Sequence, residues 1–302
     1  MADPRLNSID CPGAEGSHRM AYWEWGDPLA DHTVLCVHGL TRQGRDFDVL
    51  AQALVARSAK PLRVVCVDVA GRGESDWLAD PLGYAISAYA ADMLALLAVL
   101  KPQTLDWVGT SMGGLIGIAA SPYAQSVGAT VRRLVLNDVG PALQWDSLMR
   151  IGNYLGKNMQ FETVEQAAEY LWSISSGFGP HTPQQWLALS RPMVRPLDTG
   201  GVRLHYDPAI AVPIQTLTPE MAQQGEAALW QLYDSITAPT LLVRGAQSDL
   251  LSAATAHAMT QRGPRARLVE FEGVGHAPTF VSDAQVEVVC SFLLDEAPTP
   301  AP

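Results

Sequence analysis

The stretch DWVGTSMGGLIGIAA, Asp106–Ala120, sets an apolar run before Gly-Thr-Ser-Met-Gly and a second apolar run, dotted with glycine, after it. The first run predicts a buried strand and the second a helix, so the chain must turn sharply at Ser111. Gly109 and Gly113 carry no side chain that would obstruct such a turn. Free N–H groups at the start of the helix would stabilise negative charge beside the serine oxygen. The stretch therefore predicts a strand, a nucleophile elbow at Ser111 and a helix.

Strand-like runs alternate with helical patterns on both sides of this stretch. Near-continuous apolar runs are typical of strands covered on both faces, and hence of a mostly parallel sheet with helices on both sides. The segment His18–Pro28 alternates instead, which predicts an antiparallel edge strand. We expect the other strands at His32–Gly39, Leu62–Val69, Thr104–Gly109, Val131–Asp138, Pro239–Gly245 and Ala266–Gly273. We expect helices at Phe47–Ser58, Ala85–Leu100, Met112–Ala124, Ser252–Arg262 and Asp283–Glu296.

The alternation stops after Asp138 and resumes at Ala238. The residues between them carry helical patterns at Thr163–Ile174 and Gly225–Ile236, separated by proline-rich stretches. We interpret them as an insertion over the sheet. The expected organisation is an α/β core from residues 1–140 and 238–297, a helical cap from residues 141–237, and a loose tail at residues 298–302.

A serine hydroxyl needs a base, and the base needs a carboxylate to fix its tautomer. His276 lies in the glycine-flanked stretch EGVGHAPTF after the last expected strand, at the same sheet edge as Ser111. Two acids are candidates for the third member. Asp249 follows the expected strand Pro239–Gly245 and precedes the histidine in the chain, whereas Asp138 ends an earlier strand. We favour Asp249, keep Asp138 as the alternative, and expect Asp138 to cap backbone groups at the entry to the insertion.

A tetrahedral intermediate requires two backbone donors for its oxyanion. We expect the N–H of Met112, which follows the nucleophile, and the N–H of Leu40, in the loop after VLCVHG. His38 in that loop is expected to be structural. The segment DVAGRGESD, Asp68–Asp76, matches no phosphate-binding loop, so we assign it a shaping role.

Composition excludes several classes of function. The 302 residues include 20 Lys and Arg against 31 Asp and Glu, a net charge of −11 that repels nucleic acid. No apolar run approaches the length of a membrane span, and the first residues lack the pattern of a secretory signal. Cys36 and Cys66 lie within apolar strands, where reduced, buried thiols are expected. We expect a cytoplasmic protein with no metal, and the oligomeric state is left open.

Five motifs carry a resemblance that covers nearly the whole chain. VLCVHGL, DVAGRGESD, GTSMGG, LLVRGAQSDLL and GVGHAP, in this order and spacing, resemble the α/β-hydrolase superfamily, in its cap-bearing serine-hydrolase branch. The resemblance implies an eight-stranded, mostly parallel sheet, a cap between strands six and seven, a Ser111–His276–Asp249 triad and no cofactor. It implies a carboxylesterase-like enzyme that acts on a small-molecule ester.

The branches of the superfamily differ at their motifs. Haloalkane dehalogenases and epoxide hydrolases have aspartate at the elbow, where this chain has Ser111. Ring-cleavage carbon–carbon hydrolases share an elbow like GTSMGG but have a glycine-rich HGxGPGA loop, where this chain reads HGLTRQGRD. Carbon–carbon hydrolysis is therefore the alternative, with haloperoxidase-like perhydrolases behind it. A non-enzymatic ligand-binding protein on the same fold is the alternative of another class.

The insertion is rich in large apolar side chains, so we expect small to medium apolar esters, with lactones and polyester oligomers included. Arg42 and Arg45, beside the oxyanion loop, are candidates to contact a substrate carboxylate, but solvated loop charges are the interpretation that we favour. For any single tryptophan of the insertion, packing within the insertion is the interpretation that we favour over contact with a ligand. The candidates to line the pocket are Trp145, Trp172, Trp186, Trp230, Met149, Met159, Met193 and Phe178.

Overall fold

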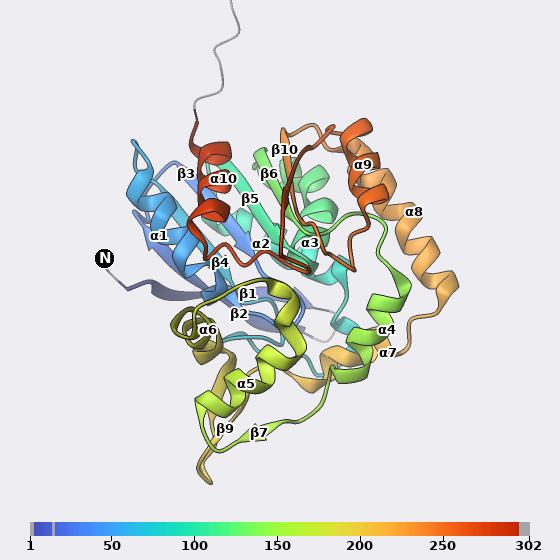
Figure 1. The fold of residues 1–302 in the computed structure, drawn as a ribbon. Helices are drawn as coiled ribbons and strands as arrows, with labels where there is room; N and C mark the ends of the chain where they lie inside the picture. The colour runs from blue at the N-terminus through green and yellow to red at the C-terminus, as the bar shows by residue number, and fades with distance from the viewer. Residues whose placement is uncertain (1–2, 14–15, 296–302) are drawn as a thin grey trace, which may run out of the picture.

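A computed structural model describes residues 3–13 and 16–295 of the chain. Its centre is a sheet that, within these residues, has eight strands in the order β1-β2-β4-β3-β5-β6-β10-β11 (Figure 1). β1 and β2 are antiparallel to each other, β2 is antiparallel to β4, and every later pair is parallel. The strands are β1 (Arg5–Gly13), β2 (Gly16–Gly26), β3 (His32–Val37), β4 (Arg63–Val67), β5 (Thr104–Thr110), β6 (Val131–Asn137), β10 (Thr240–Gly245) and β11 (Arg267–Phe271).

Both faces of this sheet are covered. Along β3, Val34 and Cys36 belong to one hydrophobic cluster, and Leu35 and Val37 belong to the other. Side chains alternate between the faces of a strand, so a strand buried on both sides needs apolar residues at every position. This explains why the inner strands read as continuous apolar runs, and the predicted mostly parallel α/β sheet is confirmed.

Helices from the two ends of the chain meet on one face of the sheet. The first cluster holds residues of α1 (Asp48–Arg57) and α10 (Asp283–Leu294), which lie side by side in Figure 1. The opposite face is covered by α2 (Ile86–Leu100), α3 (Met112–Ala120), α8 (Pro219–Ser235) and α9 (Ala253–Gln261). All five helices predicted for the core are present.

The N-terminal hairpin is larger than the sequence indicates. The expected edge strand at His18–Pro28 corresponds to β2, but β1 lies outside it and forms the actual edge. Most side chains of β1 are at least partly exposed, and Cys11 is its one fully buried residue. A strand with so little apolar content gives no pattern to recognise.

The residues between β6 and β10 form the expected helical insertion. Figure 1 shows α5 and α6 with β7 and β9 as the lower part of the molecule, whereas α8 runs along the core beside α9. Because α8 packs on α3, its part of the insertion covers the sheet layer. The boundaries at 141 and 237 remain a prediction. The elements are α4 (Trp145–Tyr154), β7 (Gln160–Phe161), α5 (Val164–Ser175), α6 (Pro183–Ser190), β8 (Val194–Pro196), β9 (Val202–Leu204), α7 (Val212–Gln215) and α8.

Other expectations concern the termini, the thiols and membrane insertion. The tail predicted at residues 298–302 lies outside the described residues. All four cysteines are buried and free, as expected for Cys36 and Cys66. Of the helices in the described ranges, none combines the length and apolar character needed to cross a membrane.

Candidate active site

Ser111 stands at the junction of β5 and α3, in the strand–turn–helix context that the sequence predicts. Its φ of 52° and ψ of −117° are unusual for a residue with a side chain, and such strain is typical of a nucleophile elbow. The flanking glycines make the turn sterically feasible. A Cβ at Gly109 would lie 2.4 Å from the Gly113 carbonyl oxygen, and a Cβ at Gly113 would lie 1.9 Å from that of Val37.

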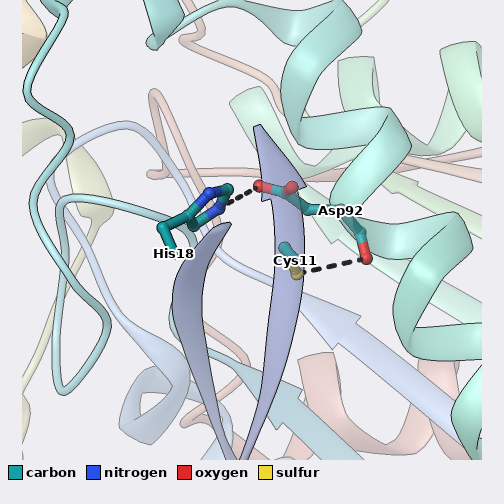
Figure 2. Close-up of side chains that lie close together, drawn as sticks. All are labelled: Cys11, His18 and Asp92. Atoms are coloured by element: carbon teal, nitrogen blue, oxygen red, sulfur yellow. Dashed lines mark hydrogen bonds and ion pairs between the residues drawn. The ribbon is translucent and has the colours of Figure 1, made fainter. Parts of the chain in front are cut away.

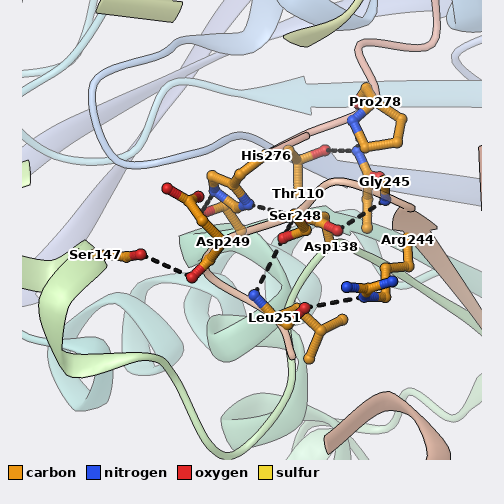
Figure 3. A network of polar contacts seen from close by, with 12 residues as sticks. Thr110, Asp138, Ser147, Arg244, Gly245, Ser248, Asp249, Leu251, His276 and Pro278 are labelled. Atoms are coloured by element: carbon orange, nitrogen blue, oxygen red, sulfur yellow. Dashed lines mark hydrogen bonds and ion pairs between the residues drawn. The ribbon is translucent and has the colours of Figure 1, made fainter. Parts of the chain in front are cut away.

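His276 connects Ser111 to a buried carboxylate. Its Nε2 lies 2.9 Å from Ser111 Oγ. Its Nδ1 lies 2.6 Å from Asp138 Oδ2, as Figure 3 shows. Asp138 follows β6 and is fully buried. It also accepts hydrogen bonds from the Gly245 N–H at 2.9 Å and from Ser248 Oγ at 2.6 Å. Donors on both carboxylate oxygens hold the group in one orientation, as a histidine partner requires.

The expectation that Asp249 holds His276 is not met in the structure. The side chain of Asp249 is 41% exposed and forms an ion pair with Arg150 of α4. The loop after β10 turns Ser248, one residue earlier, toward Asp138 (Figure 3). β6 and β10 are neighbours in the sheet, so their carboxyl ends reach the same edge, and Asp138 also lies between Ser111 and His276 in the chain. Neither chain order nor strand position distinguishes the two acids.

The expected oxyanion donors lie around Ser111. A Cβ at Gly39 would lie 3.6 Å from Ser111 Cβ, which places the loop containing Leu40 next to the serine. Within the described ranges, the Leu40 N–H has no protein acceptor. Met112 is the first residue of α3, where a helix offers no acceptor to the N–H. The two N–H groups therefore remain available for a ligand oxygen.

His38 fixes the loop that contains Leu40, a structural role that agrees with the expectation from the sequence. Its Nε2 accepts the Val69 N–H at 3.0 Å, so its Nδ1 carries the proton and donates to the Gly39 carbonyl oxygen at 2.7 Å. Burial lowers the pKa of His38 to about 3. The imidazole is therefore neutral at physiological pH, and it joins the backbone of Gly39 to that of Val69 through these two hydrogen bonds.

A small cavity of about 30 Å³ lies between the Leu40 loop and the insertion. Arg42 borders it but is paired with Asp46 at 2.6 Å and lies 5.8 Å from the centre of the Phe178 ring. Arg45 pairs with Asp48 and lies over Trp23, on the side of β2. Both arginines therefore have carboxylate partners. The cavity is lined by His38, Arg42, Asp46, Phe47, Thr110, Phe178, Leu189, Ala277, Pro278 and Thr279.

The predicted pocket aromatics divide into two groups. Phe178 packs edge-on against Trp186 at 6.2 Å, and Trp186 packs against Trp172 at 5.0 Å. These two tryptophans line a groove of about 460 Å³ together with residues of α5 and α6. Trp230 lies instead on α8, with Arg262 stacked over it, and Trp145 is half-buried at the start of α4. Trp230 therefore packs on the core side of the molecule.

One cluster in the described chain carries the donor types that metals bind. Cys11 and His18 are cross-strand partners in the β1–β2 hairpin, and with Asp92 of α2 they bring sulfur, nitrogen and oxygen atoms within 4.8 Å of one another (Figure 2). His18 Nε2 lies 3.1 Å from Asp92 Oδ2. Burial raises the pKa of the Cys11 thiol, so the thiol stays protonated. These contacts fasten the hairpin to α2. The expected absence of a metal remains a prediction.

Comparisons with known proteins agree with this fold. Residues 34–289 match the model of the alpha/beta hydrolase family. A 3-hydroxybutyrate-oligomer hydrolase from Cupriavidus necator is 49% identical over 96% of this chain and 98% of its own length. A 2-(acetamidomethylene)succinate hydrolase from Mesorhizobium japonicum is 25% identical over 86% and 87%. The crystal structure of an alpha/beta hydrolase from Novosphingobium aromaticivorans is 32% identical, covers 97% of this chain and 99% of its own, and has a TM-score of 0.81.

Proposed function

Because the chain belongs to the alpha/beta hydrolase family, we propose that it hydrolyses the ester bonds of short hydroxyalkanoate oligomers with Ser111 as the nucleophile. Membership of the family and hydrolysis of ester bonds agree with the expectations from the sequence. The proposal adds the substrate and the residues that act on it.

The hydrogen-bonded series Ser111–His276–Asp138 is the observation that carries the reaction. The Asp138 carboxylate accepts a hydrogen bond from the Nδ1–H of His276, which leaves the lone pair of Nε2 facing the Ser111 hydroxyl. The serine can then lose its proton to the imidazole as it attacks. Asp138 stabilises the imidazolium that forms, and the hydrogen bonds from Gly245 and Ser248 hold Asp138 in place.

The reaction proceeds through an acyl-enzyme. Ser111 Oγ bonds to the ester carbonyl carbon, and the carbonyl oxygen becomes an oxyanion that faces the N–H groups of Leu40 and Met112. His276 gives its proton to the leaving alkoxide as the carbon–oxygen bond breaks, which releases an alcohol. A water molecule then attacks the acyl carbon with His276 as base, and the carboxylic acid leaves as Ser111 recovers its proton.

The relative from Cupriavidus necator supports the substrate, since the two chains align over nearly their whole lengths. Aromatic side chains around Phe178 and Trp186 match the methyl and methylene groups of a neutral oligoester. No metal ion or cofactor takes part in the proposed steps.

Purified protein incubated with the dimer, trimer and tetramer of 3-hydroxybutyrate tests the proposal, with products separated by chromatography. We expect monomer to accumulate with wild type, and no product with the Ser111→Ala variant. A fluorophosphonate should add a single adduct to wild type in intact-mass spectrometry and none to the variant. Product formation by a folded Ser111→Ala variant would contradict the mechanism. Labelling of Ser111 with no cleavage of any oligomer would contradict the substrate.

A further inference from the structure

Arg72, in the loop after β4, is a buried arginine without a carboxylate partner. Its side chain is fully buried, and no carboxylate in the described ranges forms an ion pair with it. Its Nη1 donates to the Ala70 carbonyl oxygen and to Tyr89 Oη, both at 2.7 Å. Burying a cation without an acid is costly, so its positive charge requires an explanation.

Within the described residues, the groups in direct contact with Arg72 are neutral. The guanidinium carbon lies 5.6 Å from the centre of the Tyr84 ring and 5.2 Å from that of Tyr89. Burial raises the pKa of the Tyr89 phenol, so this partner stays neutral. Ring faces and carbonyl oxygens solvate the cation, and the buried carboxylate of Asp207 lies beyond Tyr84, from whose hydroxyl it accepts a hydrogen bond at 2.5 Å. The guanidinium therefore places a positive group beside the loop without pairing directly with an acid.

The same guanidinium contacts both residues that are expected to hold the oxyanion. Its Nε donates to the Leu40 carbonyl oxygen at 2.8 Å, and its Nη2 lies 3.6 Å from Met112 Sδ. Leu40 and Met112 come from separate segments of the chain, one in the loop after β3 and the other at the start of α3. A rigid, planar fork of donors can fix two such segments relative to each other, which a lysine ammonium cannot do.

The loop that carries Arg72 is itself held from the insertion. His205 accepts the Gly73 N–H at 2.7 Å through Nδ1, and its Nε2 donates to the Thr41 carbonyl oxygen at 3.3 Å. The Asp207 N–H donates to the Gly71 carbonyl oxygen at 2.8 Å. Arg72 therefore cannot swing away from Leu40 and Met112 without breaking contacts on both sides of it.

We propose that Arg72 is a positioning residue of the oxyanion hole, which fixes Leu40 and Met112 and supplies a buried positive charge behind them. This inference rests on the proposed ester hydrolysis. The negative charge on the former carbonyl oxygen exists in the tetrahedral intermediate and not in the ester, so a fixed cation nearby favours the intermediate. Arg72 does not itself contact the substrate.

The Arg72→Met variant tests the role of the charge. We would measure kcat and KM on one ester. We would also measure the affinity for a boronic acid, which forms a negatively charged adduct with serine. We expect kcat to fall about 100-fold, the loss that follows removal of one oxyanion-hole donor. KM should change less than about threefold, because the neutral ester does not sense the charge. The affinity for the boronic acid should fall in parallel with kcat.

The matched control is Arg133→Met. Arg133 is also buried, donates to the Phe292 carbonyl oxygen and lies over the Phe292 ring, but it belongs to the region where β6 meets α10. This variant should lose stability and keep the kcat of wild type. Equal losses of kcat in the two variants would overturn the proposal, because burial alone would then explain the effect.

A second variant covers the case in which Arg72→Met does not fold. Arg72→Lys keeps the charge but cannot bridge Leu40 and Met112, so we expect about a tenfold loss of kcat with KM within about threefold of wild type. A kcat equal to that of wild type would overturn the positioning role. Wild type that cleaves no ester would refute the proposed function instead, and this outcome is separate from either result.

Discussion

Replacement of Asp138 by asparagine should almost abolish turnover without unfolding the protein. An asparagine can keep its oxygen toward the Gly245 N–H, which lies 2.9 Å from Asp138 Oδ1. Its amide nitrogen then faces Nδ1 of His276, where Oδ2 of Asp138 lies at 2.6 Å. The amide donates to Nδ1, so the imidazole proton moves to Nε2 and the imidazole can no longer accept the proton of Ser111.

The expected loss in kcat is about 10⁴-fold, which corresponds to about 5.5 kcal/mol of activation free energy at about 1.4 kcal/mol per factor of ten. The assay is release of p-nitrophenol from a short-chain ester, with near-UV circular dichroism to verify folding. Asp249→Asn is the control. Its side chain is 41% exposed and its partner Arg150 is on the surface, so we expect kcat within about twofold of wild type and a stability change below about 1 kcal/mol. A large loss in Asp249→Asn with little loss in Asp138→Asn would refute the reasoning.

Three further outcomes follow from the structure. Burial lowers the pKa of His38 to about 3 and that of His205 well below its usual value. The two neutral side chains therefore stabilise the folded protein fully above about pH 6.5, and this stabilisation declines as the pH falls toward their pKa values in the folded protein. Urea unfolding between pH 7 and pH 4 should show the free energy of unfolding falling by up to about 1.4 kcal/mol per pH unit for each histidine, and a constant value would contradict this. Gly113→Ala should yield little folded protein, because the new Cβ would lie 1.9 Å from the Val37 carbonyl oxygen; normal expression and activity would show that the elbow can relax. Trp172→Ala should lower kcat/KM more for the tetramer of 3-hydroxybutyrate than for the dimer, because Trp172 lines a groove together with Trp186, whose ring packs against Phe178. Trp77→Ala is the control, since Trp77 is exposed to a similar extent, 38% against 37%, and equal effects of the two substitutions on the chain-length series would show that the groove does not bind the oligomer.

The sequence predicts the parts of the fold in which a position in the structure allows only a few residue types. The inner strands must be apolar on both faces, and the turn at Ser111 requires glycine at positions 109 and 113, so these features are recognisable from the chain alone. β1 is missed because most of its side chains are exposed and little in its sequence distinguishes it from a loop.

The assignment of the acid fails for a different reason. Asp138 and Asp249 both follow strands that end at the same edge of the sheet, and which carboxylate turns inward depends on the path of a short loop. Ser248 faces Asp138 and Asp249 faces solvent, a difference of one residue. Periodicity carries no information on the path of such a loop, whereas the buried hydrogen bonds of Asp138 settle its contacts in the structure.

The insertion also contacts the core loops that surround the candidate site. His205 and Asp207 follow β9 and are buried against the loops of the core that contain Thr41 and Gly71. Tyr84, which precedes α2, donates a hydrogen bond to Asp207 at 2.5 Å and so joins the core to the same segment. The insertion contributes His205 and Asp207 to these contacts, and polar side chains of this kind are buried only where they form hydrogen bonds, as both do here. The arrangement indicates that the segment after β9 helps to keep the loops of Leu40 and Arg72 in place, so an exchange of the whole insertion between relatives should alter kcat as well as substrate preference. An exchange that changes KM alone, with kcat preserved on a common small ester, would show that the core holds these loops without help.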